Sequence, residues 1–185
     1  PYAIAPIGAR RWTYAEAHPG WQGLRDATRF SPACVQHPYP EGSFFSRSSE
    51  PNSEDCLYLN VWSSMPEDRK LPVMVWIHGG SLTRGSGSNT VYDGGELAKK
   101  GVVLVTINYC LGAFGYMAHP ELSAETVSKS SGNYGTSDQI QALRWVHENI
   151  AAFGGDANNV TIFGESAVSW SVNHLVSSPA AAGLF

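Results

Sequence analysis

The sequence predicts an α/β fold in which a mostly parallel central sheet is flanked by helices. Three continuous apolar runs, at residues 72–78, 101–109 and 160–163, are typical of strands that are buried on both faces. A short helical segment separates the first two runs, and a longer segment with apolar residues at helical spacing separates the second from the third. Strands and helices that alternate in this way indicate a parallel sheet with right-handed crossovers.

The first third of the chain is predicted to be rich in loops. Residues 1–72 contain many Pro, Gly, Ser and aromatic residues and show weak periodicity. Within them, residues 57–62 alternate in the manner of a strand. We therefore expect a loop-rich segment with antiparallel character before the parallel sheet.

Two helices are expected between the apolar runs. Residues 93–100 form the shorter one, which the following glycine closes. The longer one is expected to begin at Thr136 or Ser137, either of which can cap it, with Asp138 in the first turn favouring the helix dipole. The glycine pair at 154–155 is expected to end it.

Length and charge exclude several classes of partner. The chain has 185 residues, enough for one domain with a core, and no internal boundary is visible. Its formal net charge is −4 with no basic block, so we expect neither nucleic acid nor an anionic membrane as a partner. No apolar run approaches the length of a transmembrane helix. The chain begins without Met and without a signal peptide, so we expect it to be part of a longer sequence.

Residues 159–168 match most of the G-x-S-x-G nucleophile elbow, in which a serine sits on a sharp turn between a strand and a helix. An apolar, β-branched run stops at Gly164, and Ser166 follows two residues later. The turn is tight, so glycine is favoured two positions before and two positions after the serine. Gly164 meets this demand and Val168 does not. Ser166 is therefore the candidate nucleophile, on an incomplete motif.

A serine nucleophile also needs N–H donors that stabilise an oxyanion. The backbone N–H of Ala167, at the start of the next helix, would be one donor. The His-Gly-Gly-Ser loop at residues 78–81 follows an earlier strand and would supply others, with Ser81 where a third small residue is expected. Because the carboxyl ends of parallel strands share one edge of a sheet, this loop and Ser166 are expected at the same edge.

The chain has three cysteines, at positions 34, 56 and 110. So small and odd a number does not indicate a disulfide scaffold. A bridge between Cys34 and Cys56 would stabilise the fold by roughly 3 kcal/mol through loop closure. Two unrelated free thiols are equally consistent with the spacing.

Together these motifs resemble the type-B carboxylesterase and lipase family of α/β hydrolases, which includes the cholinesterases. The most specific match is the run Ser-Glu-Asp-Cys-Leu-Tyr-Leu-Asn-Val-Trp at residues 53–62. Further matching segments follow in family order at residues 72–80, 108–115, 132–135, 138–139 and 153–156. The resemblance therefore covers nearly the whole chain.

The resemblance implies the α/β-hydrolase fold, with residues 1–185 as the N-terminal third of a single domain. It implies a carboxylic ester hydrolase that acts on a small-molecule ester through an acyl-enzyme, without metal or cofactor. Ser166 matches the nucleophile, and Gly80, Ser81 and Ala167 match the oxyanion-hole donors. Family members complete the triad with an acid and a histidine well downstream. We therefore expect both outside this chain, and no turnover by the chain alone.

The resemblance also implies a disulfide between Cys34 and Cys56 and an ion pair between Arg11 and Glu54. A disulfide favours a secreted or periplasmic protein, while a cytoplasmic location stays open.

Two positions depart from the family pattern. Val168 replaces the last glycine of the elbow, and its β-branched side chain is expected to crowd the strand against the helix and misplace the Ser166 hydroxyl. Cys110 stands where the family usually has an arginine that pairs with the aspartate matched by Asp138. Asp138 is then expected to be a buried carboxylate without its partner, which is costly. Both departures favour the alternative of a non-catalytic, cholinesterase-like module that binds proteins.

Simpler interpretations apply to several residues. Ser166 alone would also suit a helix cap. His174 lies eight residues past Ser166, too close in sequence to serve as the triad base, and His78 is interpreted as a structural neighbour of the oxyanion loop. The other histidines show no metal-ligand spacing. Residues 85–88 lack the ending of a phosphate-binding loop.

Overall fold

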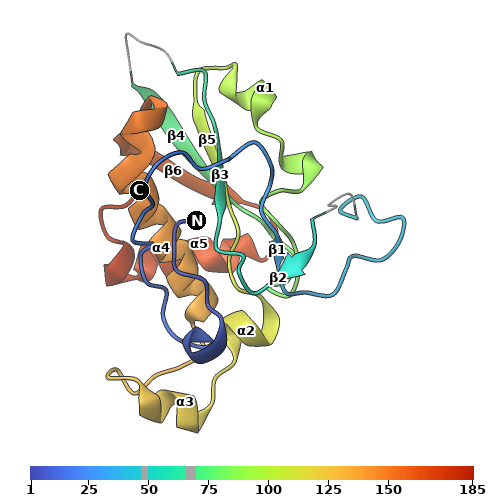
Figure 1. The fold of residues 1–185 in the computed structure, drawn as a ribbon, viewed down its shortest axis with the longest axis vertical. Helices are drawn as coiled ribbons and strands as arrows, with labels where there is room; N and C mark the ends of the chain where they lie inside the picture. The colour runs from blue at the N-terminus through green and yellow to red at the C-terminus, as the bar shows by residue number, and fades with distance from the viewer. Residues whose placement is uncertain (47–49, 66–69) are drawn as a thin grey trace.

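A computed structural model describes residues 1–46, 50–65 and 70–185 of the chain. Its centre is a four-stranded sheet with the strand order β3-β5-β4-β6 (Figure 1). The strands are β3 (Leu59–Trp62), β4 (Leu71–Ile77), β5 (Val103–Ile107) and β6 (Gly155–Gly164). β4 pairs in parallel with both β5 and β6, whereas β3 pairs antiparallel with β5. The predicted α/β fold, with a parallel sheet and an antiparallel segment before it, is confirmed.

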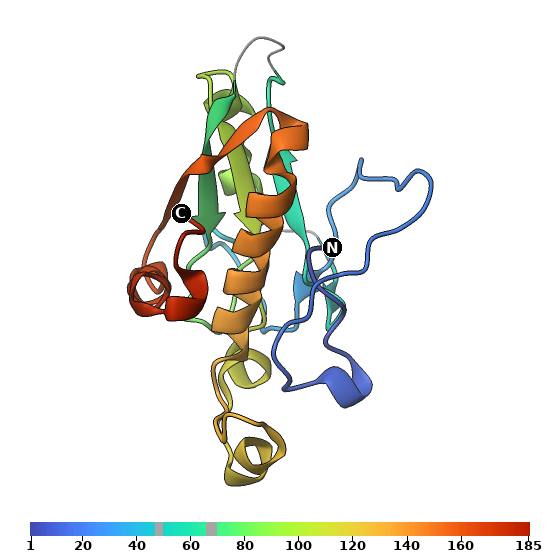
Figure 2. The ribbon, with the colours of Figure 1, turned by 90° about the vertical axis from the view of Figure 1, so that its left-hand side faces the viewer.

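Helices cover both faces of this sheet. Figures 1 and 2 show α1 and α4 on opposite sides of it, with the sheet between them. The α-helices formed by the described residues are α1 (Gly95–Ala98), α2 (Gly112–Tyr116), α3 (Pro120–Glu125), α4 (Tyr134–Asn149) and α5 (Val168–Ser177). The short 3₁₀ turns among them are η1 (Gly8–Arg10), η2 (Thr90–Tyr92), η3 (Ile150–Phe153) and η4 (Pro179–Ala181). None of the helices in these ranges is long and apolar enough to cross a membrane.

The long helix α4 begins earlier than the sequence pattern predicts. Its N-cap is Asn133, so the prediction that Thr136 or Ser137 caps it is wrong. The hydroxyl of Ser137 instead accepts the N–H of Ala15 at 3.0 Å, and Asp138 falls beyond the first turn. Gly135 lies in the first turn of α4. A side chain there would collide with the carbonyl of Cys110 and the ring of Tyr116, so glycine is required by packing inside the helix rather than ending it.

The strand interiors form the core. All five residues of β5 are buried, as expected for a central parallel strand. In β4 only alternate residues are buried, namely Leu71, Val73, Val75 and Ile77, while Trp76 is half-buried. The ring of Trp76 packs against Tyr92 and Phe163 on that less covered face. The expectation of burial on both faces therefore holds for β5 and only in part for β4. It is wrong for residues 160–163 of β6, of which only Val160 is buried.

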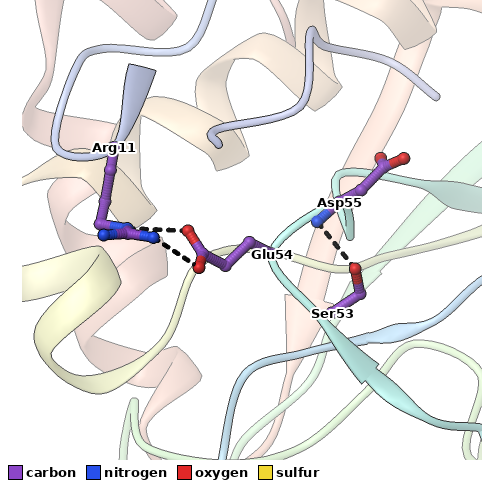
Figure 3. Close-up of polar contacts among 4 residues, drawn as sticks. All are labelled: Arg11, Ser53, Glu54 and Asp55. Atoms are coloured by element: carbon purple, nitrogen blue, oxygen red, sulfur yellow. Dashed lines mark hydrogen bonds and ion pairs between the residues drawn. The ribbon is translucent and has the colours of Figure 1, made fainter. Parts of the chain in front are cut away.

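The loop-rich first third is fastened to the sheet by covalent and polar links. β1 (Ala33–Cys34) pairs in parallel with β2 (Asn52–Ser53), and Cys34 forms a disulfide with Cys56. Arg11 donates two hydrogen bonds to the carboxylate of Glu54, at 2.8 and 2.7 Å (Figure 3). The implied disulfide and the implied ion pair are both present.

The carboxyl ends of the parallel strands lie side by side. Ile77, the last residue of β4, is in register with Ile107 at the end of β5 and with Gly164 at the end of β6. The loop that follows β4 and the turn that follows β6 therefore leave the sheet at the same edge, as predicted for open α/β sheets.

Candidate active site

The turn after β6 has the geometry of a nucleophile elbow. β6 ends at Gly164 and α5 begins at Val168, so only residues 165–167 connect strand to helix. Ser166 has a φ of 62°, in the left-handed region that non-glycine residues rarely adopt, and it is exposed. A strained, exposed serine between a strand and a helix is the form that the elbow requires. The role of Ser166 as nucleophile stays a prediction.

Val168 occupies the space directly against Gly164. It is fully buried at the first position of α5, and a Cβ on Gly164 would collide with its Cγ1 and with the carbonyl of Ile77. Gly164 is therefore required by close approach of strand and helix. The turn forms with valine in the last motif position, and the expected displacement of the Ser166 hydroxyl stays a prediction.

The loop after β4 lies against this elbow. A Cβ built on Gly79 would lie 3.3 Å from the Cβ of Ser166 and 2.6 Å from the carbonyl oxygen of Glu165. No side chain fits between the two segments, so the backbone of the loop reaches the serine directly. The predicted proximity of the His-Gly-Gly loop to Ser166 is thus present.

The candidate oxyanion donors have unpaired N–H groups. Within the described part of the chain, the N–H groups of Gly80, Ser81 and Ala167 donate to no other group. Gly80 and Ser81 have φ values of 114° and 56°, so consecutive residues of the loop adopt left-handed backbone. Unpaired, preorganised N–H donors beside a serine can stabilise an oxyanion. Their convergence on one oxyanion stays a prediction.

His78 is buried beneath the loop and is neutral. Its Nδ1 lies 2.9 Å from the carbonyl oxygen of Gly79, and since a carbonyl can only accept, Nδ1 carries the proton. The ring stacks on Tyr109 with centroids 4.6 Å apart, and the Tyr109 hydroxyl donates to the His78 carbonyl at 2.7 Å. Burial lowers the pKa of His78 to about 4. His78 is therefore held as a neutral donor to the loop.

Asp138 is a buried carboxylate without a cationic partner. It is 2% exposed and forms no ion pair among the described residues. The N–H of Cys110 donates to it at 2.9 Å. Burial raises the pKa of Asp138 to about 6, and this hydrogen bond opposes the shift. Burial and the neighbouring carboxylate together raise the pKa of the Cys110 thiol well above its usual range. The expectation of an unpartnered Asp138 is confirmed, with Cys110 as its remaining hydrogen-bond donor.

No described histidine hydrogen-bonds to Ser166. His174 is exposed on α5, and His78 is buried with its Nδ1 committed to Gly79. The described residues also contain no group of three or more His, Cys, Asp and Glu placed to hold a metal ion.

Sequence reasoning missed one polar contact of the loop. The side-chain amide of Gln36 hydrogen-bonds to both the N–H and the carbonyl of Gly85, at 2.6 and 2.7 Å. Gln36 and Gly85 are 49 residues apart, and no spacing or motif connects them. Only the folded arrangement reveals the contact.

Comparison with known proteins gives a consistent result. The carboxylesterase family matches residues 1–185. The chain is 46% identical to fumonisin B1 esterase of Sphingopyxis macrogoltabida and 46% identical to para-nitrobenzyl esterase of Bacillus subtilis, covering 100% of this chain in both cases. It superposes on a carboxylesterase of Geobacillus stearothermophilus with a TM-score of 0.88 and 50% identity over 100% of this chain.

The chain spans about a third of the length of these proteins: 34% and 37% of the two esterases and 36% of the solved structure. Over that third, its strands and helices follow the α/β-hydrolase fold of the solved structure. The match over the whole chain shows that the protein belongs to the carboxylesterase family.

Proposed function

We propose that the protein containing this chain hydrolyses carboxylic esters of small molecules through an acyl-enzyme formed on Ser166. The observation that carries the proposal is the contact between the elbow and the loop. Ser166 is exposed in left-handed backbone, and Gly79 packs directly against it. The N–H groups of Gly80, Ser81 and Ala167, which donate to no group among the described residues, belong to these same two segments.

In the proposed reaction the Ser166 oxygen attacks the ester carbonyl while a base takes the hydroxyl proton. The carbonyl electron pair moves onto oxygen, and the three N–H groups stabilise that negative charge. The intermediate collapses, the alcohol leaves with the proton from the base, and the acyl group stays on Ser166. Water then attacks the acyl-enzyme by the same route and releases the carboxylic acid. Neither step requires a metal or a cofactor.

The proposal places the triad acid and histidine in sequence outside this chain. Residues 1–185 then form part of one domain, and the chain alone does not turn over. The fraction of each relative that this chain covers, about a third, supports the placement of the acid and the histidine outside the chain. The Cys34–Cys56 disulfide supports a secreted or periplasmic location.

The test is ester hydrolysis by the full-length protein. We expect turnover of p-nitrophenyl acetate that Ser166→Ala abolishes and that Ser169→Ala, an exposed serine on α5, leaves unchanged. Turnover that survives in Ser166→Ala would contradict the assignment of the nucleophile.

The second candidate is a non-catalytic module that binds proteins. Val168 in the elbow and Cys110 beside Asp138 favour it, because both replace residues that the family resemblance expects. A folded full-length protein without esterase activity would support this candidate.

A further inference from the structure

The side chain of Gln36 forms a clamp on Gly85. The N–H of Gly85 donates to Oε1 of Gln36 at 2.6 Å, and Nε2 donates back to the carbonyl of Gly85 at 2.7 Å. The same Nε2 also donates to the carbonyl of Cys34 at 2.9 Å. Because one backbone group is a donor and the other two are acceptors, only the carboxamide orientation with oxygen toward the Gly85 N–H satisfies all three. A carboxylate or an apolar side chain of the same length cannot.

Gly85 in turn packs against His78 and Gly79, the first two residues of the oxyanion loop at residues 78–81. It has a φ of 114°, and a Cβ there would collide with Nδ1 of His78 and lie 2.5 Å from the carbonyl oxygen of Gly79. The bare backbone of Gly85 therefore packs directly against the hydrogen bond between His78 and Gly79. Displacement of Gly85 opens space at this hydrogen bond.

The Gly79 carbonyl and the Gly80 N–H belong to the same peptide unit. That unit is planar and trans, so its C=O and N–H point in opposite directions. A restraint on the carbonyl oxygen therefore fixes the direction of the N–H. His78 restrains the oxygen with its Nδ1–H at 2.9 Å, and Gly85 closes the space beside it.

Gln36 belongs to a segment that is cross-linked to the rest of the fold. Gln36 lies two residues after Cys34, which is held by its disulfide to Cys56 and by pairing of β1 with β2. The side chain of Asn52 on β2 donates to the backbone carbonyl of Gln36 at 2.7 Å. Gln36 thus connects a cross-linked segment to the loop beside Ser166.

We infer that Gln36 is a positioning residue for ester hydrolysis, whose carboxamide holds Gly85 against the His78–Gly79 contact and so fixes the Gly80 N–H in the direction that an oxyanion needs. The inference rests on the proposed function. Gln36 does not touch the substrate. It acts through Gly85 and the Gly79–Gly80 peptide.

The first experiment compares two variants of the full-length protein with the wild type by kcat and KM. Gln36→Leu removes both hydrogen bonds to Gly85, and we expect kcat to fall about tenfold, below the loss for a whole oxyanion donor, with KM changed less than about threefold. Ser53→Ala, on the same strand β2, is the matched control, because it removes a hydrogen bond from the Asp55 N–H and leaves the hydrogen bonds of Gln36 in place, so kcat is expected to stay unchanged. An unchanged kcat in folded Gln36→Leu overturns the inference.

The second readout is a pH-dependent rescue. In Gln36→Glu the introduced carboxylate still accepts the Gly85 N–H, but it repels the carbonyls of Gly85 and Cys34. Protonation of the introduced carboxyl restores one donor. We expect the ratio of wild-type to variant kcat to shrink as the pH falls from 7 to 5, on the fraction of protein that stays folded. A ratio that is constant with pH contradicts a role for the donated hydrogen bond.

Two controls separate this inference from the proposed function. Ser166→Ala tests the function, and if its loss of activity is complete while Gln36→Leu is fully active, only the inference fails. Hydrogen–deuterium exchange of residues 79–86 tests the clamp without any activity. Faster exchange there in Gln36→Leu than in Ser53→Ala supports the clamp, and equal exchange overturns it even in a protein that hydrolyses no ester.

Discussion

The backbone N–H of Cys110 donates a 2.9 Å hydrogen bond to the buried carboxylate of Asp138. Among the residues that the structure describes, Tyr2, Cys110 and Tyr116 interact electrostatically with this carboxylate, and none of these three is a cation. A charged carboxylate in such surroundings is stabilised by one main-chain donor and penalised by burial. The effect of burying the Asp138 carboxylate beside Cys110 should therefore be measurable in the pH dependence of the free energy of unfolding.

We predict that Asp138→Asn stabilises the protein at pH 7. The folded-state pKa of Asp138, about 6, lies above its ordinary value of 3.8, so the folded protein binds this proton more tightly than the unfolded chain. The contribution of Asp138 is fully present below pH 4 and is lost as the pH rises through 6. The loss is on the order of 3 kcal/mol in the free energy of unfolding. Asparagine keeps an oxygen that accepts the Cys110 N–H.

The measurement is urea unfolding of both proteins between pH 4 and 7. Wild-type data alone do not suffice, because His78 acts with the opposite sign. Its pKa is lowered from 6.5 to about 4, so its contribution is present above pH 6.5 and is lost as the pH falls through 4. We expect the two unfolding curves to diverge as the pH rises. Parallel curves would show that Asp138 is not the group with the raised pKa.

We predict that His78 supports catalysis through its Nδ1–H. His78→Phe keeps a ring against Tyr109 but removes the donor to the Gly79 carbonyl, and kcat is expected to fall about tenfold or more with KM nearly unchanged. His78→Asn places a donor close to the Nδ1 position and is expected to retain most of kcat. Steady-state kinetics on folded protein decides, and equal loss in both variants would mean that His78 only fills space.

We predict that Val168→Gly raises kcat and lowers stability. Glycine relieves the crowding against Gly164 and lets the Ser166 hydroxyl take its reactive position. If this lowers the activation free energy by about 1.4 kcal/mol, kcat rises tenfold. Loss of a fully buried side chain at a helix start costs roughly 2–3 kcal/mol of unfolding free energy. The matched control is Val172→Gly, one turn further along α5, which lowers stability without raising kcat. An unchanged kcat in Val168→Gly would show that the valine does not disturb the hydroxyl.

Local rules predicted the parts of the fold and site where few residue types fit. The apolar runs at residues 72–78, 101–109 and 160–163 located β4, β5 and β6, but the burial on both faces that such runs predict is found only in β5. Gly79 and Gly164 marked the loop and the elbow, because the backbone approaches too closely there for any side chain. These constraints limit the residue types at a few neighbouring positions, so a short stretch of sequence is enough to predict them.

The parts that sequence reasoning missed depend on distant partners. Gly135 lies inside α4 because Cys110 and Tyr116 pack on it, and nothing within the helix sequence indicates this. The short helices α2 and α3 lack a long periodic pattern. The clamp of Gln36 on Gly85 joins two loops by two hydrogen bonds, and neither loop has a motif that predicts the other.

The most direct test of the central claim is covalent labelling of the full-length protein with a fluorophosphonate, followed by peptide mass spectrometry. An activated serine beside an oxyanion site attacks the phosphorus, expels fluoride and keeps the phosphonyl group. We predict one phosphonyl group per chain, on Ser166, and none in Ser166→Ala. A folded full-length protein that is not labelled, or one labelled at another serine, would contradict the account.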